Sequence, residues 1–165
     1  MGEKLVGSEY VKMTPSADKT VWSATVNKKE TELLINSNAV LLDVLRDQVG
    51  TLGVKRGCDL GTCGCCTVMI DGEPRLSCLC LAGQVSDTEI VTVEGLADGA
   101  HLAPIQACFA KYGGSQCGIC TPGFLVASQA LLENNPSPSD EQISEAIEGN
   151  LCPVSYTHLT LPTKA

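Results

Sequence analysis

A run of closely spaced cysteines between Arg56 and Cys78 constrains this chain more than any other feature. The stretch reads RGCDLGTCGCCTVMIDGEPRLSC, with four residues between Cys58 and Cys63, two between Cys63 and Cys66, and Cys78 further on. Plant-type 2Fe–2S clusters are bound by cysteine thiolates with this spacing. The stretch therefore predicts a 2Fe–2S site in which Cys58, Cys63, Cys66 and Cys78 are the ligands.

Three glycines, Gly57, Gly61 and Gly64, alternate with these cysteines. Three ligands from one tight loop require backbone with positive φ, which glycine adopts without steric cost. The same glycines let amide N–H groups approach the sulfur atoms, where they stabilise negative charge. Lys55 and Arg56 come just before the loop, so we expect their positive charge to raise the reduction potential.

Two other chemistries use the same cysteines. The C-x2-C pair of Cys63 and Cys66 matches a second pair, Cys117 and Cys120, so a zinc ion bound by four thiolates is one alternative. A disulfide framework is the other, since the chain has 10 cysteines. Cys58 favours the iron–sulfur interpretation, because a four-residue gap rich in glycine is not the usual geometry of a zinc knuckle.

Composition limits the partners and the compartment. With 165 residues and 44% hydrophobic content, the chain is large enough to bury a core. A net charge of -8 argues against nucleic acid and membrane surfaces as partners. The sequence shows no run of eighteen apolar residues and no apolar signal-peptide core, and its many cysteines suit a reducing environment, so we expect a cytoplasmic protein.

The hydrophobic pattern predicts two parts. Residues 1–20 lack periodicity and are expected to be a flexible segment, whereas 21–35 read as a hairpin with a turn at 27–30. Apolar residues within 41–49 share one helical face, and Asp71-Gly72 predicts a second hairpin. A further strand near 89–94 completes a small mixed sheet packed on a helix, which ends near residue 97.

After a linker at 97–100 the pattern becomes helical. One helix ends at Gly113-Gly114, a second begins at Pro122, and a third is capped by Ser139 or Asp140. The face of the first of these helices contains Ile105, Cys108, Phe109 and Tyr112. The loops between these helices contain Cys117, Cys120 and Cys152, which makes a second metal centre possible.

Four motifs, GCDLGTCGCCTV, DGEPRLSCL, QCGICTPGFL and EGNLC, resemble the iron–sulfur subunit of the xanthine dehydrogenase, aldehyde oxidoreductase and carbon monoxide dehydrogenase family of molybdenum hydroxylases. The resemblance implies an α+β chain, with a β-grasp ferredoxin-like domain at 21–97 and an all-α helical-bundle domain at 98–152. It places a first 2Fe–2S cluster on Cys58, Cys63, Cys66 and Cys78, and a second on Cys117, Cys120 and Cys152. It also implies that Gln116 reaches a molybdopterin cofactor in another subunit.

The chain departs from this family pattern after Cys152. The family has a second cysteine two residues later, followed by Thr-Gly-Tyr, whereas this chain has Val154 at that position. Residues 153–165 look foreign to the family, and the expected last helix is missing. The resemblance therefore implies a truncated copy in which the second cluster lacks its fourth ligand.

The remaining polar and thiol residues have simpler interpretations. Cys65, Cys80 and Cys108 match no ligand position and are expected to be buried thiols, while His101 is expected to be a linker or surface residue. No dinucleotide or flavin motif is present. By resemblance, the chain passes electrons from a molybdopterin-binding large subunit through two 2Fe–2S clusters to FAD on a medium subunit. A free-standing ferredoxin and a zinc-stabilised interaction module remain as alternatives.

Overall fold

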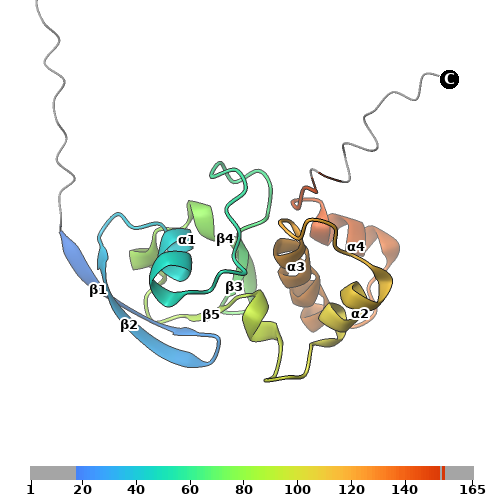
Figure 1. The fold of residues 1–165 in the computed structure, drawn as a ribbon, viewed down its shortest axis with the longest axis horizontal. Coiled ribbons are helices and arrows are strands. Elements are labelled where there is room, and N and C mark those ends of the chain that lie inside the picture. The colour runs from blue at the N-terminus through green and yellow to red at the C-terminus, as the bar shows by residue number, and fades with distance from the viewer. Residues whose placement is uncertain (1–17, 153, 155–165) are drawn as a thin grey trace, which may run out of the picture.

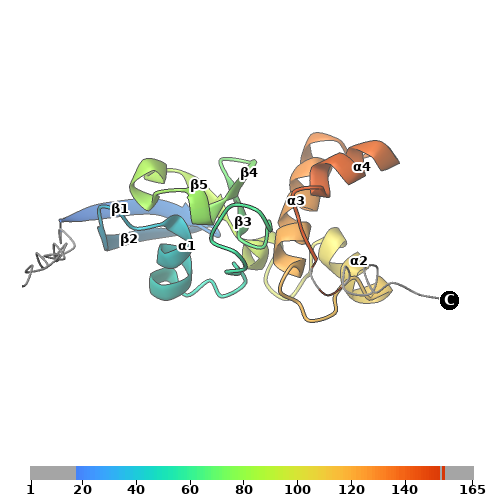
Figure 2. The ribbon, with the colours of Figure 1, turned by 90° about the horizontal axis from the view of Figure 1, so that it is seen from above.

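The structure is a computed structural model that describes residues 18–152 and residue 154. It has two parts that lie side by side, a sheet with its helix and a group of three helices (Figures 1 and 2). The order of elements along the chain is hairpin, helix, long loop, hairpin, strand and then three helices. This mixed α and β content agrees with the α+β class expected from the sequence.

Five strands form one mixed sheet. They are β1 (Lys19–Val26), β2 (Lys29–Asn36), β3 (Thr67–Ile70), β4 (Glu73–Leu76) and β5 (Glu89–Val91). Their order across the sheet is β2-β1-β5-β3-β4. The central pair, β1 and β5, is parallel, while the other neighbours are antiparallel. The long loop between α1 and β3, which contains the predicted ligands, is thus anchored to an inner strand.

Both hairpins turn through residues with positive φ. Asp71 and Gly72 have φ of 50° and 83°, as the Asp-Gly signal predicts for a two-residue turn. Asn27 and Lys28 have φ of 50° and 67° and form the first turn. This turn is shorter than the predicted 27–30, because Lys29 already belongs to β2.

The helix between the hairpins changes its hydrogen-bonding pattern along its length. Helix α1 (Leu41–Asp43) continues as the π-helical segment Val44–Val49 and ends at Gly50, whose φ is 89°. Leu41, Leu42 and Leu45 are buried, as the periodicity predicted. Val44 is buried as well, because it lies three residues after Leu41 and so shares the same helical face.

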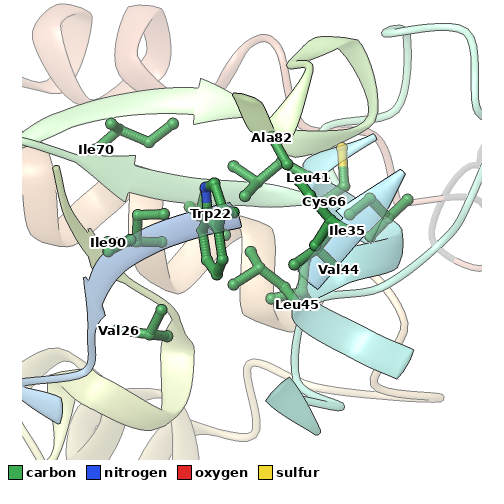
Figure 3. Packing of buried hydrophobic residues seen from close by; sticks show 14 residues of the cluster. Trp22, Val26, Ile35, Leu41, Val44, Leu45, Cys66, Ile70, Ala82 and Ile90 are labelled. Atoms are coloured by element: carbon green, nitrogen blue, oxygen red, sulfur yellow. The ribbon is translucent and has the colours of Figure 1, made fainter. Parts of the chain in front are cut away.

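Trp22 lies at the centre of the main core, surrounded by aliphatic side chains from the sheet and from α1 (Figure 3). It is fully buried, and within the described part of the chain its indole nitrogen has no hydrogen-bond partner. The tryptophan is therefore held by packing rather than by polar contacts. The other large members of this cluster are Ile35, Leu41, Leu42, Leu45, Val54, Val68 and Ile90.

The helical part consists of α2 (Pro104–Tyr112), α3 (Thr121–Asn134) and α4 (Asp140–Ile147). The predicted end signals are confirmed, since Gly113 caps α2 with φ of 68° and Pro122 lies in the first turn of α3. Ser139 caps α4: its hydroxyl accepts from the Gln142 amide at 3.4 Å, and its own amide donates to the Gln142 side chain at 2.9 Å.

The two parts share a small apolar cluster. Met69 on β3 packs with Val126 and Ala130 on α3, and Val91, Val93 and Leu96 border them. Both ribbon views place α3 next to the sheet (Figures 1 and 2). Helix α3 therefore packs the helical part onto the sheet.

Some expectations need correction. The strand expected at 89–94 ends at Val91, and Val93–Leu96 form a 3₁₀ turn instead. Cys108 was expected to be buried but is exposed. Strand β1 begins at Lys19, inside the segment 1–20 that was expected to be flexible.

Residues 1–17 lie outside the described residues, as does the foreign-looking tail 153–165 apart from Val154. Among the described residues, every helix is too short or too polar to cross a lipid bilayer.

Candidate metal centres

The loop between α1 and β3 directs backbone N–H groups at the Cys58 sulfur. The amides of Leu60 and Thr62 each donate to Cys58 Sγ at 3.4 Å. Together with a hydrogen bond from Cys63, they lower the pKa of the Cys58 thiol to about 7. Asp59 and Gly61, with φ of 55° and 73°, supply the left-handed backbone that brings these amides inward. The loop thus favours a thiolate at Cys58.

The four predicted ligands of this loop approach one another in pairs. The Cys58 and Cys63 side chains hydrogen-bond, and so do those of Cys66 and Cys78. Burial raises the pKa of Cys66 to about 11, and the neighbouring Cys78 thiol also raises it. Within the described residues, no three Cys, His, Asp or Glu side chains are close enough to count as a ready-made metal site.

The backbone around these thiols suits an inorganic centre. A Cβ on Gly57 would lie 2.7 Å from Cys63 Sγ, so only a glycine lets the backbone pass so close to that sulfur. Cysteine thiolates are the ligands of 2Fe–2S clusters, and amide donors stabilise the added negative charge. The donor set, the inward N–H groups and the glycine contact therefore fit a 2Fe–2S cluster.

Arg56 is held beside this loop by two carboxylates. Its guanidinium donates to Asp59 at 2.6 Å and pairs with Asp43 of α1. The hydrogen bond to Asp59 raises the pKa of Arg56, and the negative charge of Cys78 and Cys66 also contributes. Lys55 differs, because its ammonium group donates to the Leu52 carbonyl at 2.8 Å. Arg56, and not Lys55, is therefore the basic residue that interacts electrostatically with the ligand thiols Cys66 and Cys78.

The second predicted group of thiols lies where the helices begin and end. Cys117 is exposed in the loop after α2, Cys120 is the N-cap of α3, and Cys152 follows α4. Burial raises the pKa of Cys120 to about 11, and its hydrogen bond to the Cys152 side chain adds to this rise. Cys120 and Cys152 thus approach each other at one end of the helical part, with Cys117 in the same loop as Cys120.

Gln116 lies in the same loop as Cys117 and is exposed. Gly118, two residues further on, has φ of 86°, which keeps the loop tightly curved between Cys117 and Cys120. An exposed glutamine next to this cysteine group is accessible from outside the chain.

Two contacts that sequence reasoning missed connect the two cysteine groups. The Leu151 amide donates to the Cys63 carbonyl at 2.9 Å, and the Asn150 side chain donates to the Gly64 carbonyl at 3.0 Å. These residues are separated by more than eighty positions in the chain, and no local pattern signals the pairing. The only available signal was the place of Asn150 and Leu151 next to the predicted ligand Cys152.

The remaining cysteines have different environments. All 10 cysteines are free thiols, so the structure gives no support to a disulfide framework. Cys65 is only 2% exposed, and burial raises its pKa to about 12. Cys80 is half-buried, and burial raises its pKa as well, whereas Cys108 is exposed on α2.

Comparison with known protein families identifies two domains. Residues 9–111 match the family described as a 2Fe-2S iron-sulfur cluster binding domain, and residues 92–157 match the one described as a [2Fe-2S] binding domain. The first match contains Cys58, Cys63, Cys66 and Cys78. The second contains Cys117, Cys120 and Cys152.

Several relatives match this chain over most of both lengths. The small FeS subunit of nicotinate dehydrogenase from Eubacterium barkeri is 42% identical over 135 residues, which are 82% of this chain and 86% of the relative. The small subunit of nicotine 6-hydroxylase from Paenarthrobacter nicotinovorans is 44% identical over 140 residues, covering 84% of each chain. Among solved structures, quinoline 2-oxidoreductase from Pseudomonas putida 86 has a TM-score of 0.79 at 42% identity, covering 81% of this chain and 83% of that one.

The fold and the two domain matches define an iron–sulfur protein of the electron-transfer class. The chain belongs to the family of small FeS subunits of the molybdenum hydroxylases, which includes the xanthine and nicotinate dehydrogenases and the aldehyde oxidoreductases. It is thus an electron-transfer subunit of an oxidoreductase complex.

Proposed function

We propose that this chain has two 2Fe–2S sites in two domains, of which the second needs a fourth thiolate to hold its cluster, and that with both sites filled it relays electrons between two partner subunits. Residues 21–97 form the β-grasp ferredoxin domain, and residues 98–152 form the helical domain. The ligands of the first cluster are Cys58, Cys63, Cys66 and Cys78, and those of the second are Cys117, Cys120 and Cys152.

The observation that carries this proposal is the pair of amide donors at Cys58. Leu60 and Thr62 direct their N–H groups at one sulfur, an arrangement that stabilises a thiolate before any metal is present. When bound, a 2Fe–2S cluster supplies reversible one-electron chemistry. The chain's own contribution is to fix the positions of the thiols, to shield Cys63 and Cys66 from solvent, and to place Arg56 nearby.

The proposed partners are a molybdopterin-binding large subunit and an FAD-binding medium subunit, with the complex in the cytoplasm. The exposed position of Gln116 beside Cys117 supports an approach of the large subunit to the helical domain. Ten free thiols suit a reducing compartment. A free-standing ferredoxin is not favoured, because such a carrier needs only the first of the two matched domains.

Substitution of one ligand tests the first site. Cys63→Ser in the full-length chain should remove the low-temperature EPR signal that the dithionite-reduced protein shows, because serine does not supply a thiolate. Cys80→Ser is the matched control, since it changes a half-buried thiol of the same part that is not a proposed ligand. Protein purified without oxygen that contains stoichiometric zinc and no iron would overturn the proposal in favour of a zinc-stabilised module.

Gln116→Ala tests the contact with the large subunit. In a complex rebuilt with both partners, this variant should lower the retention of molybdopterin while leaving the EPR signal of the first cluster unchanged. Gln129→Ala is the control, because Gln129 is a glutamine on α3 that bonds Glu133 within its own helix at 2.9 Å. Equal molybdopterin content in the Gln116→Ala and Gln129→Ala complexes would contradict this role for Gln116.

A further inference from the structure

The two proposed cluster sites touch through a short stretch of backbone. Leu151, next to Cys152 of the second site, donates its amide to the carbonyl of Cys63 of the first site at 2.9 Å. The route from one sulfur to the other thus runs along covalent bonds from Cys152 to Leu151, crosses one hydrogen bond, and continues through Cys63.

The side chain of Asn150 holds this contact in place. It is 6% exposed, and its Nδ2 donates to the Gly64 carbonyl at 3.0 Å, immediately after Cys63 in the chain. The hydrogen bonds from Asn150 and Leu151 therefore join adjacent residues of one segment to adjacent residues of the other. Two neighbouring bonds of this kind fix both the separation and the orientation of the segments.

Glycines allow the close approach. A Cβ on Gly64 would lie 2.6 Å from the Gly149 carbonyl, and a Cβ on Gly123 would lie 2.7 Å from Asn150 Nδ2. Gly64 and Gly123 are themselves in close contact. The loop of the first site, the start of α3 and the segment after α4 thus meet around the Asn150 amide.

The Gly64 carbonyl does not depend on Asn150 for its hydrogen bonding. It also accepts from the Thr67 amide at 3.1 Å and from the Thr67 hydroxyl at 2.7 Å, at the point where the loop enters β3. Loss of the Asn150 side chain therefore leaves no unsatisfied carbonyl in the ligand loop of the first site. What it removes is a bond between the two parts.

We propose that Asn150 is a positioning residue that sets the electronic coupling between the two cluster sites by holding the Leu151 amide against the Cys63 carbonyl. This inference rests on the proposed pair of clusters. Its consequence is that the coupling depends on a side chain that is not itself a ligand. Coupling between the sites weakens when Asn150 cannot donate, although each site keeps its own thiols.

The test uses the full-length chain carrying Val154→Cys, which gives the second site a fourth thiolate. After reduction with dithionite, two paramagnetic clusters in close contact split each other's EPR signals. Adding Asn150→Ala or Asn150→Asp should decrease this splitting at unchanged iron content, because neither variant has the amide donor that fixes the separation of the two segments. Asn134→Ala is the matched control, because it removes a similar bond, from Asn134 to the Ala130 carbonyl at 3.0 Å, away from both sites.

Hydrogen exchange of the Leu151 amide gives a second readout that does not depend on iron. Its exchange should become about fivefold faster or more in both Asn150 variants and should stay unchanged in Asn134→Ala. If Asn150→Ala loses iron, the hydrogen exchange of the Leu151 amide in the isosteric Asn150→Asp variant tests whether Asn150 holds that amide in place. Unchanged exchange there would overturn the inference.

Two further outcomes would also overturn the inference. One is an equal EPR splitting with full iron content in all the variants. The other is iron confined to the first site in the Val154→Cys chain, because no second centre would then exist to be coupled. Absence of iron from every protein, including the parent, would instead mark failure of the proposed function.

Discussion

The sheet part and the helical part of this chain are stabilised in different ways. The sheet part has its own large core around Trp22, whereas α2 and α4 contain no fully buried residue. The buried face of α3 packs on Met69, which belongs to the sheet. A domain normally folds on a core of its own. The helical part therefore depends on the sheet part for much of its burial, and the reverse does not hold.

The largest expected effect concerns metal content, because the first site has four thiols and the second has three. We expect the unmodified chain to bind about two irons, and Val154→Cys to raise this to about four, since each 2Fe–2S cluster needs four protein ligands. Iron analysis and EPR after reduction measure both values. Val154→Ser is the control that adds polarity without a thiolate, and four irons in the unmodified chain would contradict the prediction.

Trp22→Ala should have the largest effect on stability. It leaves a cavity at the centre of the main core and should lower the free energy of unfolding by about 3–5 kcal/mol. Tyr112→Ala removes an aromatic ring from α2 that is 75% exposed, so its effect should stay within about 0.5 kcal/mol. Urea denaturation followed by circular dichroism measures the free energy of unfolding of both variants. Tryptophan fluorescence is unsuitable, because the chain has only 1 Trp and Trp22→Ala removes it. Similar decreases in the free energy of unfolding of both variants would contradict the difference in burial between the sheet part and the helical part.

Val126→Ala should loosen the attachment of the helical part. Val126 is fully buried between α3 and the sheet, and its truncation should cost about 2 kcal/mol. Limited proteolysis should then cut within 98–152 sooner, while the sheet part stays protected. Val21→Ala makes the same change at a position that is 62% exposed, and it should leave the cleavage pattern as it is. Faster cleavage of the sheet part instead would show that the dependence runs in both directions.

Ser139→Ala should have the smallest effect, confined to the start of α4. It removes the hydroxyl that accepts from the Gln142 amide, which should cost about 1 kcal/mol. Ser137→Ala changes a serine two residues before the N-cap and should change the stability by less than about 0.5 kcal/mol. Hydrogen exchange of the α4 amides measures this local loss, and equal exchange in the two variants would contradict the role of the cap.

Signals carried by a few adjacent residues predicted the structure well. The Asp71-Gly72 turn, the cap at Ser139 and the end of α2 at Gly113 are all present, because each depends on the backbone preferences of one or two residues. The change to π-helical structure after Asp43 was not predicted. Periodicity identifies the buried face of a helix, but it does not report which carbonyl each amide bonds.

Properties that depend on distant segments were predicted less well. Cys108 shares a helical face with Ile105 and Phe109, which are half-buried, yet Cys108 itself is exposed, so its place on the face did not decide its burial. The contacts of Asn150 and Leu151 with the first site were missed as well. The cysteine spacing indicated which thiols belong together, while the bonds between the two groups required three-dimensional structure.

The parallel pairing of β1 with β5 affects how the chain folds during its synthesis. Val26 pairs with Ile90, so the central pair of the sheet cannot form until 64 more residues have been made. At about 5–20 residues per second, this delay is about 3–13 s. During that time the inner edge of β1 is open for pairing with other nascent chains. The speed of translation between these two strands therefore sets how long the hairpin is exposed to aggregation on the ribosome.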